Sequence, residues 1–429
     1  MIFLIIINAH LYIGLELKVF LVGGAVRDEL LNISIKDKDY VVIGATAKQL
    51  LDLKYQQVGK DFPVFLHPKT REEYALARTE KKVANGHKGF QCIANPNVTL
   101  EEDLLRRDLT INAIAKDANG TFYDPFNGFK DIKNKVLRHV SPAFTEDPLR
   151  VLRVARFAAK LAPLGFTIAP ETMTLMQKIS QGSELNSLPA ERVWLEFEKA
   201  LATDSPQVFI QVLIQCDAFK NLFLPHTPDK LKDQINNAAY LALSSLEKAV
   251  QLTEDKTVRF ITFLIALENV LTKRLATAEI KNKDATTKSL AKEKSFENNI
   301  TSHFINTLSP PKSYFMLFKQ ACEQQEPLAI LFALTAMEIL TVFDSIDVWR
   351  KPEQLTKLIN IFIALHSNKQ GIQDFGSAHG EYLKKCYQVA KSIEIKPILL
   401  AGFRGGEIHV QLKKLQVKSI NTIIFNYKK

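Results

Sequence analysis

The chain has 429 residues, and at about 100–200 residues per domain it should form two to four units. Hydrophobic residues make up 46% and charged residues 24%, with only 17 glycines and 17 prolines, which excludes disordered, collagen-like and low-complexity classes. Fifty-six Lys and Arg against 46 Asp and Glu leave a net charge of +10, which favours a polyanionic partner.

The chain carries no sign of secretion or of a membrane span. Its cysteines are scattered without a C-x-x-C pair or a disulfide pattern, which favours a reduced, cytoplasmic protein: Cys92, Cys216, Cys322 and Cys386. No apolar run reaches the ~18–20 residues of a membrane helix. Residues 1–17 are partly apolar but lack a basic start and a cleavage site, so we interpret them as an extension or a mis-assigned start.

Residues 18–140 have the pattern of an α/β domain with a sheet at its centre. Val19–Val22 is a short apolar strand, two glycines end it, and Ala25–Leu31 has helical spacing. The further expected elements are strands at Tyr40–Ile43, Pro63–Leu66 and Glu73–Leu76 and a helix at Ala45–Leu53.

From about residue 141 onwards, helical patterns replace strand patterns. We expect helices at Leu149–Leu161, Ala190–Leu201, Pro206–Ile214, Leu241–Leu252, Tyr314–Phe343 and Gln354–His366. The polar stretch Ala276–Lys294 is expected to be a solvated helix or a linker. We predict a helical segment at 141–225 and a second at 226–429, whose basic end is a candidate surface for RNA.

Two carboxylates two residues apart are the sharpest chemical feature. Asp37 and Asp39 stand at the head of an apolar strand, where alternate side chains point to the same side. Hard oxygen ligands in this pattern suit Mg²⁺ together with substrate phosphates. A D-x-D pair alone more often marks a strand end or a turn. Glu73 is a candidate third carboxylate if its strand flanks Asp39.

A glycine pair lies 13 residues before this acidic pair. Gly23 and Gly24 follow a buried strand, so backbone N–H groups there can approach a phosphate without a Cβ in the way. Arg27 lies one turn into the following helix and can reach the same phosphates. By itself, the glycine pair is equally compatible with a plain strand-to-helix turn.

Five motifs in order resemble those of the class II tRNA nucleotidyltransferases and bacterial poly(A) polymerases. The chain is most similar to the long bacterial CCA-adding enzymes. The matching segments are Leu21–Asp28, Asp37–Asp39, Arg106–Ala113, Tyr123–Gly128 and Glu146–Phe157. The resemblance implies an α+β nucleotidyltransferase head with a polymerase-β-like mixed sheet, followed by an all-α neck, body and tail.

The resemblance also implies a role for each matched residue. Asp37 and Asp39 would be catalytic and would bind Mg²⁺. The residues implied to bind ATP or CTP are Gly24, Arg27, Arg107, Asp147, Arg150, Arg153 and Arg156. Within this set, Asp147 and Arg150 would read the nucleobase from one helix face as i and i+3 neighbours. Tyr123–Gly128 would be the hinge between head and neck.

The sequence departs from its long relatives at one point. Many of them carry an HD phosphohydrolase domain after the neck, and its His-Asp pair is replaced here by Ile265 and Ala266. Aliphatic side chains bind no divalent cation, so we expect no phosphohydrolase activity.

The resulting prediction is template-independent addition of CCA to tRNA from CTP and ATP. Two alternatives stay open at this point. A poly(A) polymerase would share the D-x-D and E-D-x-x-R motifs, and a non-catalytic RNA-binding protein would share the fold. The oligomeric state is not predicted.

Overall fold

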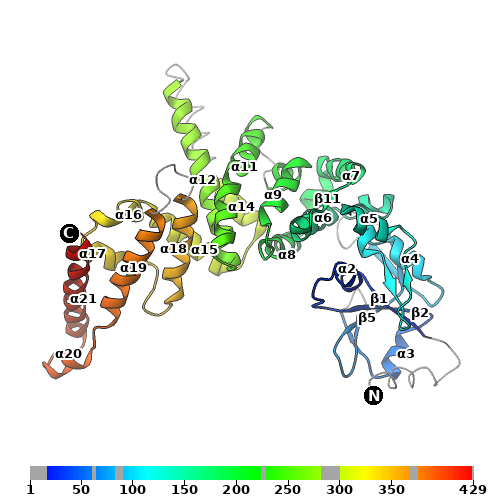
Figure 1. Cartoon of the computed structure of the whole chain (residues 1–429), viewed down its shortest axis with the longest axis horizontal. Helices are drawn as coiled ribbons and strands as arrows, with labels where there is room; N and C mark the ends of the chain where they lie inside the picture. The colour runs from blue at the N-terminus through cyan, green and yellow to red at the C-terminus, as the bar shows by residue number, and fades with distance from the viewer. Residues whose placement is uncertain are drawn as a thin grey trace. The chain divides into compact units, whose positions relative to one another are not determined.

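The computed structural model describes residues 17–59, 64–82, 90–223, 229–281, 300–366 and 375–427. The chain divides into two compact units (Figure 1). Unit 1 comprises Met1–Ala200 and Val208–Pro225, and unit 2 comprises Leu201–Gln207 and His226–Lys429.

A seven-stranded mixed sheet forms the centre of unit 1, in the order β3-β4-β5-β2-β1-β8-β9. Its strands are β1 (Lys18–Val22), β2 (Asp39–Ile43), β3 (Gln56–Val58), β4 (Val64–Leu66), β5 (Glu73–Leu76), β8 (Ala115–Lys116) and β9 (Phe122–Tyr123). Neighbouring strands are antiparallel except β2 and β5, which are parallel. The expected mixed sheet in the head is therefore confirmed.

The sheet is buried on both faces because apolar residues stand at consecutive positions of its central strand. Val41 packs with Phe20 and Val22 in one cluster, whereas Val42 packs with Leu50 and Phe65 in another. Successive side chains of a strand point to opposite faces, so one short run supplies both cores.

Short helices and a hairpin surround this sheet. The helices are α2 (Gly24–Leu30), α3 (Ala47–Asp52), α4 (Leu100–Leu105), α5 (Gly128–Asn134) and the 3₁₀ turn η3 (Thr110–Asn112). β6 (Arg78–Lys82) and β7 (Phe90–Ala94) form a separate antiparallel pair. Capping boxes at Thr46 and Thr99 begin α3 and α4, each through a reciprocal bond to the residue three positions on.

The remainder of unit 1 is helical apart from one short parallel strand pair. Its elements are the 3₁₀ turns η4 (Pro142–Glu146), η5 (Ala162–Leu164) and η6 (Ser183–Ser187), the strands β10 (Val136–Leu137) and β11 (Thr167–Ile168), and helices α6 (Leu149–Leu161), α7 (Pro170–Gln181), α8 (Ala190–Leu201), α9 (Pro206–Gln215) and α10 (Ala218–Phe223). α6 and α8 have the bounds expected from sequence, because their apolar residues recur at strict helical spacing.

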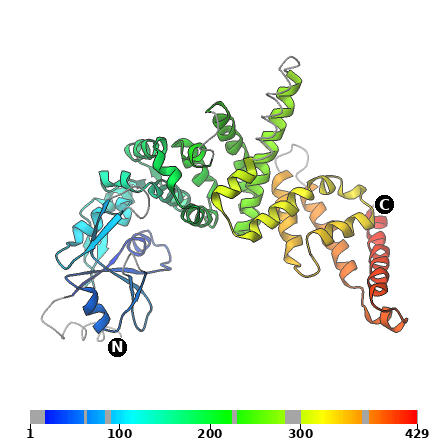
Figure 2. The same cartoon turned by 180° about the vertical axis from the view of Figure 1, so that it is seen from behind.

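Every described element of unit 2 is a helix. They are α11 (Asp229–Leu252), α12 (Lys256–Lys281), α14 (Ile300–Leu308), α15 (Lys312–Glu323), α16 (Gln325–Ala329), η7 (Leu331–Ala333), α17 (Ala336–Ser345), α18 (Glu353–His366), α19 (Phe375–Lys391), α20 (Lys396–Leu400) and α21 (Gly406–Tyr427). α11, α12 and α18 pack against one another, and α19 packs against α21 (Figure 2). The predicted helical architecture after the head is confirmed, except that the short strand β11 lies within the segment expected to be all-helical.

The stretch Ala276–Lys294 has a mixed outcome. α12 continues through its first residues to Lys281, as expected for a solvated helix, and residues 282–299 lie outside the described part. The predicted N-terminal extension also lies outside it, up to residue 16.

Candidate active site

The glycine pair forms a tight turn between β1 and α2. Gly23 has φ +71°, and a Cβ there would lie 2.9 Å from Nη1 of Arg107. Left-handed backbone and the close approach of a guanidinium both require glycine at this position. Gly24 begins α2, so the turn brings the backbone of the head directly beside Arg107.

Arg27 on α2 is buried and held on two sides. Its Nε and Nη2 donate to Oδ1 of Asp28 at 2.8 and 2.7 Å, and its Nη1 donates to Oδ1 of Asn112 at 2.5 Å. The second oxygen of Asp28 accepts from Nζ of Lys160 at 2.9 Å. Asp28 therefore links the head helix α2 to helix α6, which lies more than 100 residues further along the chain.

The acidic pair is arranged differently from the expectation. Asp39 is the first residue of β2 and pairs with Val22 on β1 and with Glu73 on β5. Asp37 is exposed and precedes the strand, so the alternation of strand side chains does not apply to it. Placing both carboxylates on the strand was wrong, because pairing with β1 begins only at Asp39.

The two carboxylates nevertheless affect each other electrostatically. Desolvation by the surrounding protein raises the pKa of Asp39, the charge of Arg107 lowers it, and the charge of Asp37 raises it further, so the net shift is upward. A carboxylate whose neighbour is another carboxylate gains most from a bound cation. Glu73 on β5 lies beside Asp39 in the sheet, so its strand flanks Asp39.

Asp103 on α4 is a buried anchor for two arginines. Its Oδ1 accepts from Arg106 at 2.7 Å and its Oδ2 from Arg107 at 3.2 Å. Burial by itself would raise the pKa of Asp103, but the two guanidinium groups outweigh it and lower that pKa. Nε of Arg107 is buried and has no hydrogen-bond partner among the described residues, so this arginine retains a donor for a ligand.

Asp108 is a buried junction between head and neck. Its Oδ2 accepts from Nε and Nη2 of Arg153 at 2.8 and 2.7 Å, and its Oδ1 accepts from Asn112 at 3.0 Å. Burial raises the pKa of Asp108, but Arg153 and the hydrogen bonds lower it well below its usual range. The charge of Asp108 is in turn the main reason that the pKa of Arg153 is raised.

The proposed base-reading pair spans the start of α6: Asp147 lies just before the helix and Arg150 is its second residue. Asp147 is extended, with φ −114° and ψ 105°, and its Oδ1 accepts from the backbone N–H of Leu149 at 3.0 Å. The expectation that Asp147 and Arg150 are i and i+3 neighbours on one helix was wrong, because α6 begins at Leu149. Arg150 is buried and donates to the carbonyl oxygens of Ala143 and Arg106 at 3.1 and 2.6 Å.

Helix α8 contributes two charged residues that the sequence analysis did not identify. Nη2 of Arg192 lies 3.6 Å from Oδ2 of Asp147, and Oε2 of the buried Glu196 accepts from Nε of Arg156 at 2.5 Å. The one signal for them was their helical spacing of four, which suits two residues of one face. Nothing in the sequence indicated that this face meets α6.

These side chains surround one cavity of about 610 Å³. It is lined by Gly23, Gly24, Arg27, Asp39, Arg78, Arg106, Arg107, Asp108, Asn112, Asp147, Leu149, Arg150, Arg153, Arg156, Phe157, Lys160 and Arg192. Eight of the nine residues predicted for the site are among them, and Asp37 is not. Nine lining residues are basic and three are acidic, so the cavity suits a polyanion.

Lys160 is a further basic residue that the sequence analysis missed. It continues the row Arg150, Arg153 and Arg156 along α6 by helical spacing, which is the signal that would have found it. Burial and the charge of Arg27 lower its pKa, although Asp28 opposes this shift.

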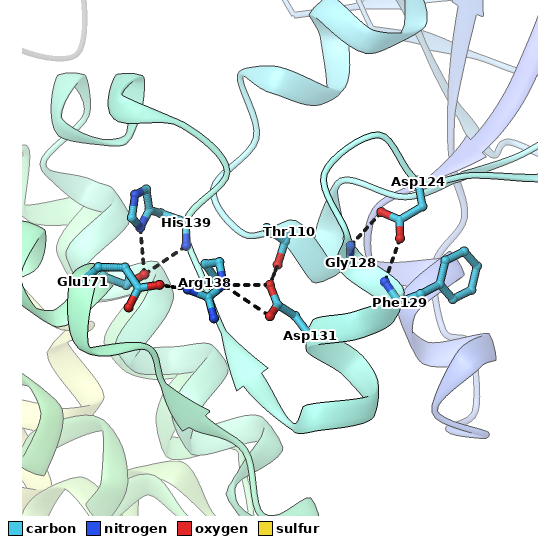
Figure 3. Close-up of polar contacts among 9 residues, drawn as sticks. Thr110, Asp124, Gly128, Phe129, Asp131, Arg138, His139 and Glu171 are labelled. Atoms are coloured by element: carbon cyan, nitrogen blue, oxygen red, sulfur yellow. Dashed lines mark hydrogen bonds and ion pairs between the residues drawn. The ribbon is translucent and has the colours of Figure 1, made fainter.

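Carboxylates fix the hinge-like segment Tyr123–Gly128 and the helix that follows it through hydrogen bonds (Figure 3). Asp124 accepts from the backbone N–H groups of Gly128 and Phe129 at 2.6 and 2.8 Å. Asp131 accepts from Oγ1 of Thr110 at 2.7 Å and from Nε of Arg138 at 3.2 Å.

The same network continues from the hinge into α7. Arg138 also pairs with Glu171, and the backbone N–H of His139 donates to Oγ1 of Thr172 at 3.0 Å (Figure 3). A Cβ on Gly128 would lie 2.4 Å from the carbonyl oxygen of Thr110, so α5 and η3 meet at a distance that only glycine permits. The connection between sheet and helices is therefore held at several points.

The region in which the sequence lacks the His-Asp pair is apolar in the structure. Ile265 and Ala266 lie on α12 and are buried. Nδ1 of His366 lies 2.8 Å from the carbonyl oxygen of Phe362, while His226 and the side chain of His303 are outside the described part. Within the described ranges no three His, Cys, Asp or Glu residues group as a metal site. The absence of phosphohydrolase activity stays a prediction.

None of the helices that the structure describes is both long and apolar enough to span a membrane.

Comparison with known proteins identifies similar sequences along the whole chain. The sequence profile described as "Poly A polymerase head domain" matches residues 19–138, and that described as "Probable RNA and SrmB- binding site of polymerase A" matches residues 165–231. The "Multifunctional CCA protein" of Shewanella denitrificans is 46% identical over 416 residues, which cover 94% of this chain and 97% of that protein.

Solved structures share the fold at lower identity. "The complex structure of CCA-adding enzyme with ATP" is 20% identical, covers 96% of this chain and 89% of its own, and has a TM-score of 0.62. "Thermotoga maritima CCA-adding enzyme complexed with tRNA_CCA" is 19% identical, covers 96% and 90%, and has a TM-score of 0.62.

Proposed function

The chain belongs to the family of the multifunctional CCA proteins, and from this premise we propose that its cavity transfers nucleotides from CTP and ATP to the 3′ end of tRNA. The charge of the cavity is the observation that carries the proposal. Nine basic side chains surround about 610 Å³, a volume in the range of small-molecule sites. A nucleoside triphosphate has the negative charge that would neutralise these basic side chains. Its base carries donors for the carboxylate acceptors at the cavity wall.

We assign the phosphates to the part of the cavity beside the glycine turn. Gly24 lines the cavity there, Arg27 is held by Asp28 and Asn112, and Nε of Arg107 is a buried donor without a partner among the described residues. Arg153 and Arg156 are each fixed by one carboxylate, so the guanidinium groups are oriented before a ligand arrives. Side chains that are preorganised in this way lower the entropic cost of binding and of reaction.

Asp37 and Asp39 fit the divalent metal that nucleotidyltransferases of this family generally use. Their oxygens are hard ligands, and the mutual effect of the two charges on the pKa of Asp39 favours an adjacent cation. We propose Mg²⁺, which when bound would neutralise charge on the triphosphate and on the attacking oxygen. Asp39 stands at the end of β2 in the cavity wall, where it can hold the acceptor end toward the triphosphate.

The reaction is an in-line displacement at phosphorus. The 3′-hydroxyl of the tRNA loses its proton to solvent and its oxygen attacks the α-phosphorus of the nucleotide. A new phosphodiester bond forms while the bond from the α-phosphorus to the oxygen that bridges to the β-phosphorus breaks, and pyrophosphate leaves. The basic residues at the cavity stabilise the charge that develops on the phosphoryl oxygens and on the pyrophosphate.

We assign nucleobase selection to the start of α6. Asp147 presents carboxylate acceptors at the cavity wall, and its position is held by the N–H of Leu149 and by Arg192. Arg150 ties this segment to the carbonyl oxygens of Ala143 and Arg106, next to the arginines of the head. A fixed set of donors and acceptors can replace a nucleic-acid template, because C and A differ in the pattern along their pairing edges.

Incorporation of labelled nucleotides into tRNA that lacks its 3′ CCA tests the proposal. CTP alone should give two additions, ATP alone none, and both together three. Runs of A from ATP alone would instead identify a poly(A) polymerase, and no product with Mg²⁺ would identify a non-catalytic RNA-binding protein. Because tRNA is the acceptor, we place the reaction in the cytoplasm.

A further inference from the structure

One aromatic ring lines the basic cavity. Phe157 on α6 is 7% exposed and is the cavity-lining residue with an aromatic ring. The guanidinium carbons of three arginines lie over this ring: that of Arg156 at 4.3 Å from the ring centroid, that of Arg27 at 5.0 Å and that of Arg153 at 5.9 Å. All three distances are within the range of cation–π attraction.

The three arginines come from different places and have different carboxylate partners. Arg27 belongs to α2 in the head and binds Asp28, whereas Arg153 and Arg156 belong to α6. Asp108, on the head side, pairs with Arg153, and Glu196 on α8 pairs with Arg156. The ring of Phe157 is therefore the feature that these three guanidinium groups share.

Charge explains why an aromatic residue suits this position. Like charges in a partly buried site repel one another, and in the described part of the chain Asp28, Asp108 and Glu196 each form an ion pair with one of the three arginines. The negative face of a π-system attracts a cation without accepting the N–H groups at the guanidinium edge. A carboxylate in the same place would occupy those N–H groups and would repel a triphosphate.

We propose that Phe157 is a positioning residue that holds Arg27, Arg153 and Arg156 at the cavity by a shared cation–π attraction and so prepares it for the phosphates of the nucleotide. This inference rests on the proposed function for the identity of the ligand, but the arrangement of ring and arginines stands without it. An aliphatic residue of similar volume would fill the space and leave the guanidinium groups without this attraction.

The experiment replaces Phe157 by phenylalanines that carry one, two, three or four ring fluorines, in the full-length protein. Each fluorine weakens the negative charge of the ring face and leaves the packing nearly unchanged. Phe166, which is 6% exposed and has no cation over its ring among the described residues, receives the same series as a matched control. Phe157→Leu completes the set.

Two readouts separate the ring from general stability. The first is equilibrium binding of inorganic tripolyphosphate and of CTP by calorimetry, and the second is KM and kcat for CTP addition. We expect binding to weaken stepwise along the Phe157 series, by about tenfold in total, with KM rising in parallel and kcat changing little. Phe157→Leu should match the most fluorinated variant, and the Phe166 series should be flat.

Flat binding along the Phe157 series would overturn the inference, as would equal losses at Phe157 and Phe166. Phe157→Leu need not fold for this conclusion, because the fluorinated variants carry the test and their thermal unfolding midpoints are measured alongside. If wild-type protein adds no nucleotide to tRNA but tripolyphosphate binding still falls along the series, the proposed function fails and the role of the ring stands.

Discussion

At the scale of single residues, Asp39 is the member of the proposed metal-binding pair that lines the cavity. Asp39 lies at the start of β2 in the proposed metal site, whereas tRNA affinity is spread over basic surface. Asp39→Ala should therefore reduce incorporation of both CTP and ATP by about a hundredfold or more. Binding of tRNA, measured by filter retention, should stay within a few fold. An equal loss of tRNA binding would show that Asp39 is structural.

Asp39→Asn is the matched variant for this prediction. It keeps the volume at the start of β2 and the pairing with β1, and it removes the charge. We expect the same loss of incorporation as for alanine, with an unchanged unfolding midpoint.

Asp108 links protonation to stability. Its pKa is lower in the folded protein than in the unfolded chain, so the stabilisation is present above pH ~3.9 and is lost as the pH falls toward the folded pKa. Asp108→Asn should cost about 1.5–3 kcal/mol of unfolding free energy at pH 7, since the charged bond to Arg153 is lost. Urea unfolding at several pH values should show this difference shrinking below pH ~4. A difference that does not change between pH 7 and pH 3.5 would contradict it.

At the scale of elements, the start of α6 should decide selectivity. Asp147→Ala should relax discrimination among CTP, ATP and UTP by on the order of 1–3 kcal/mol, more than it slows total incorporation. Competition assays with pairs of labelled nucleotides measure this directly. The variant also frees Arg192, so Arg192→Gln serves as control: it keeps Asp147 and should relax discrimination less. Loss of stability with selectivity intact would make Asp147 a helix-capping residue.

The close approach of α5 to η3 gives a prediction about the connection between sheet and helices. Gly128→Ala should destabilise the protein by about 1–3 kcal/mol, because its Cβ would meet the carbonyl oxygen of Thr110 at 2.4 Å. Gly406→Ala is the control, since nothing lies within 4 Å of a Cβ there and Gly406 is within α21. If Gly128→Ala leaves the thermal unfolding midpoint unchanged, the hinge segment can shift to accommodate the added Cβ.

The elements also show where sequence reasoning was strong. α6, α8 and β5 have the bounds expected from sequence, because each has a clear apolar period and a clear end. The two-residue strands β8 and β9 were not predicted. Strands this short carry no period, and they form because β1 offers an edge to β8, which in turn pairs with β9.

At the scale of the whole molecule, we expect unit 2 to lack phosphohydrolase activity. We predict no hydrolysis of 2′,3′-cyclic nucleotides or p-nitrophenyl phosphate with Ni²⁺, Mn²⁺, Co²⁺ or Mg²⁺, because Ile265 and Ala266 are buried aliphatic residues where a His-Asp pair is expected. Chromatography of the nucleotide products and the absorbance of released p-nitrophenol measure this. Metal-dependent hydrolysis that survives Asp37→Ala with Asp39→Ala would show a second site.

The sequence by itself determined the types of the main elements, the family and most of the residues at the cavity, since short motifs and periodic patterns are local. Only the tertiary structure decided that Asp37 and Asp147 stand just outside their elements, and that Asp28 meets Lys160 and Glu196 meets Arg156. It also placed Arg27 over the ring of Phe157. The physical reason is distance along the chain: charges and rings tens of residues apart interact only where packing brings them within a few ångströms, and local propensity does not encode that geometry.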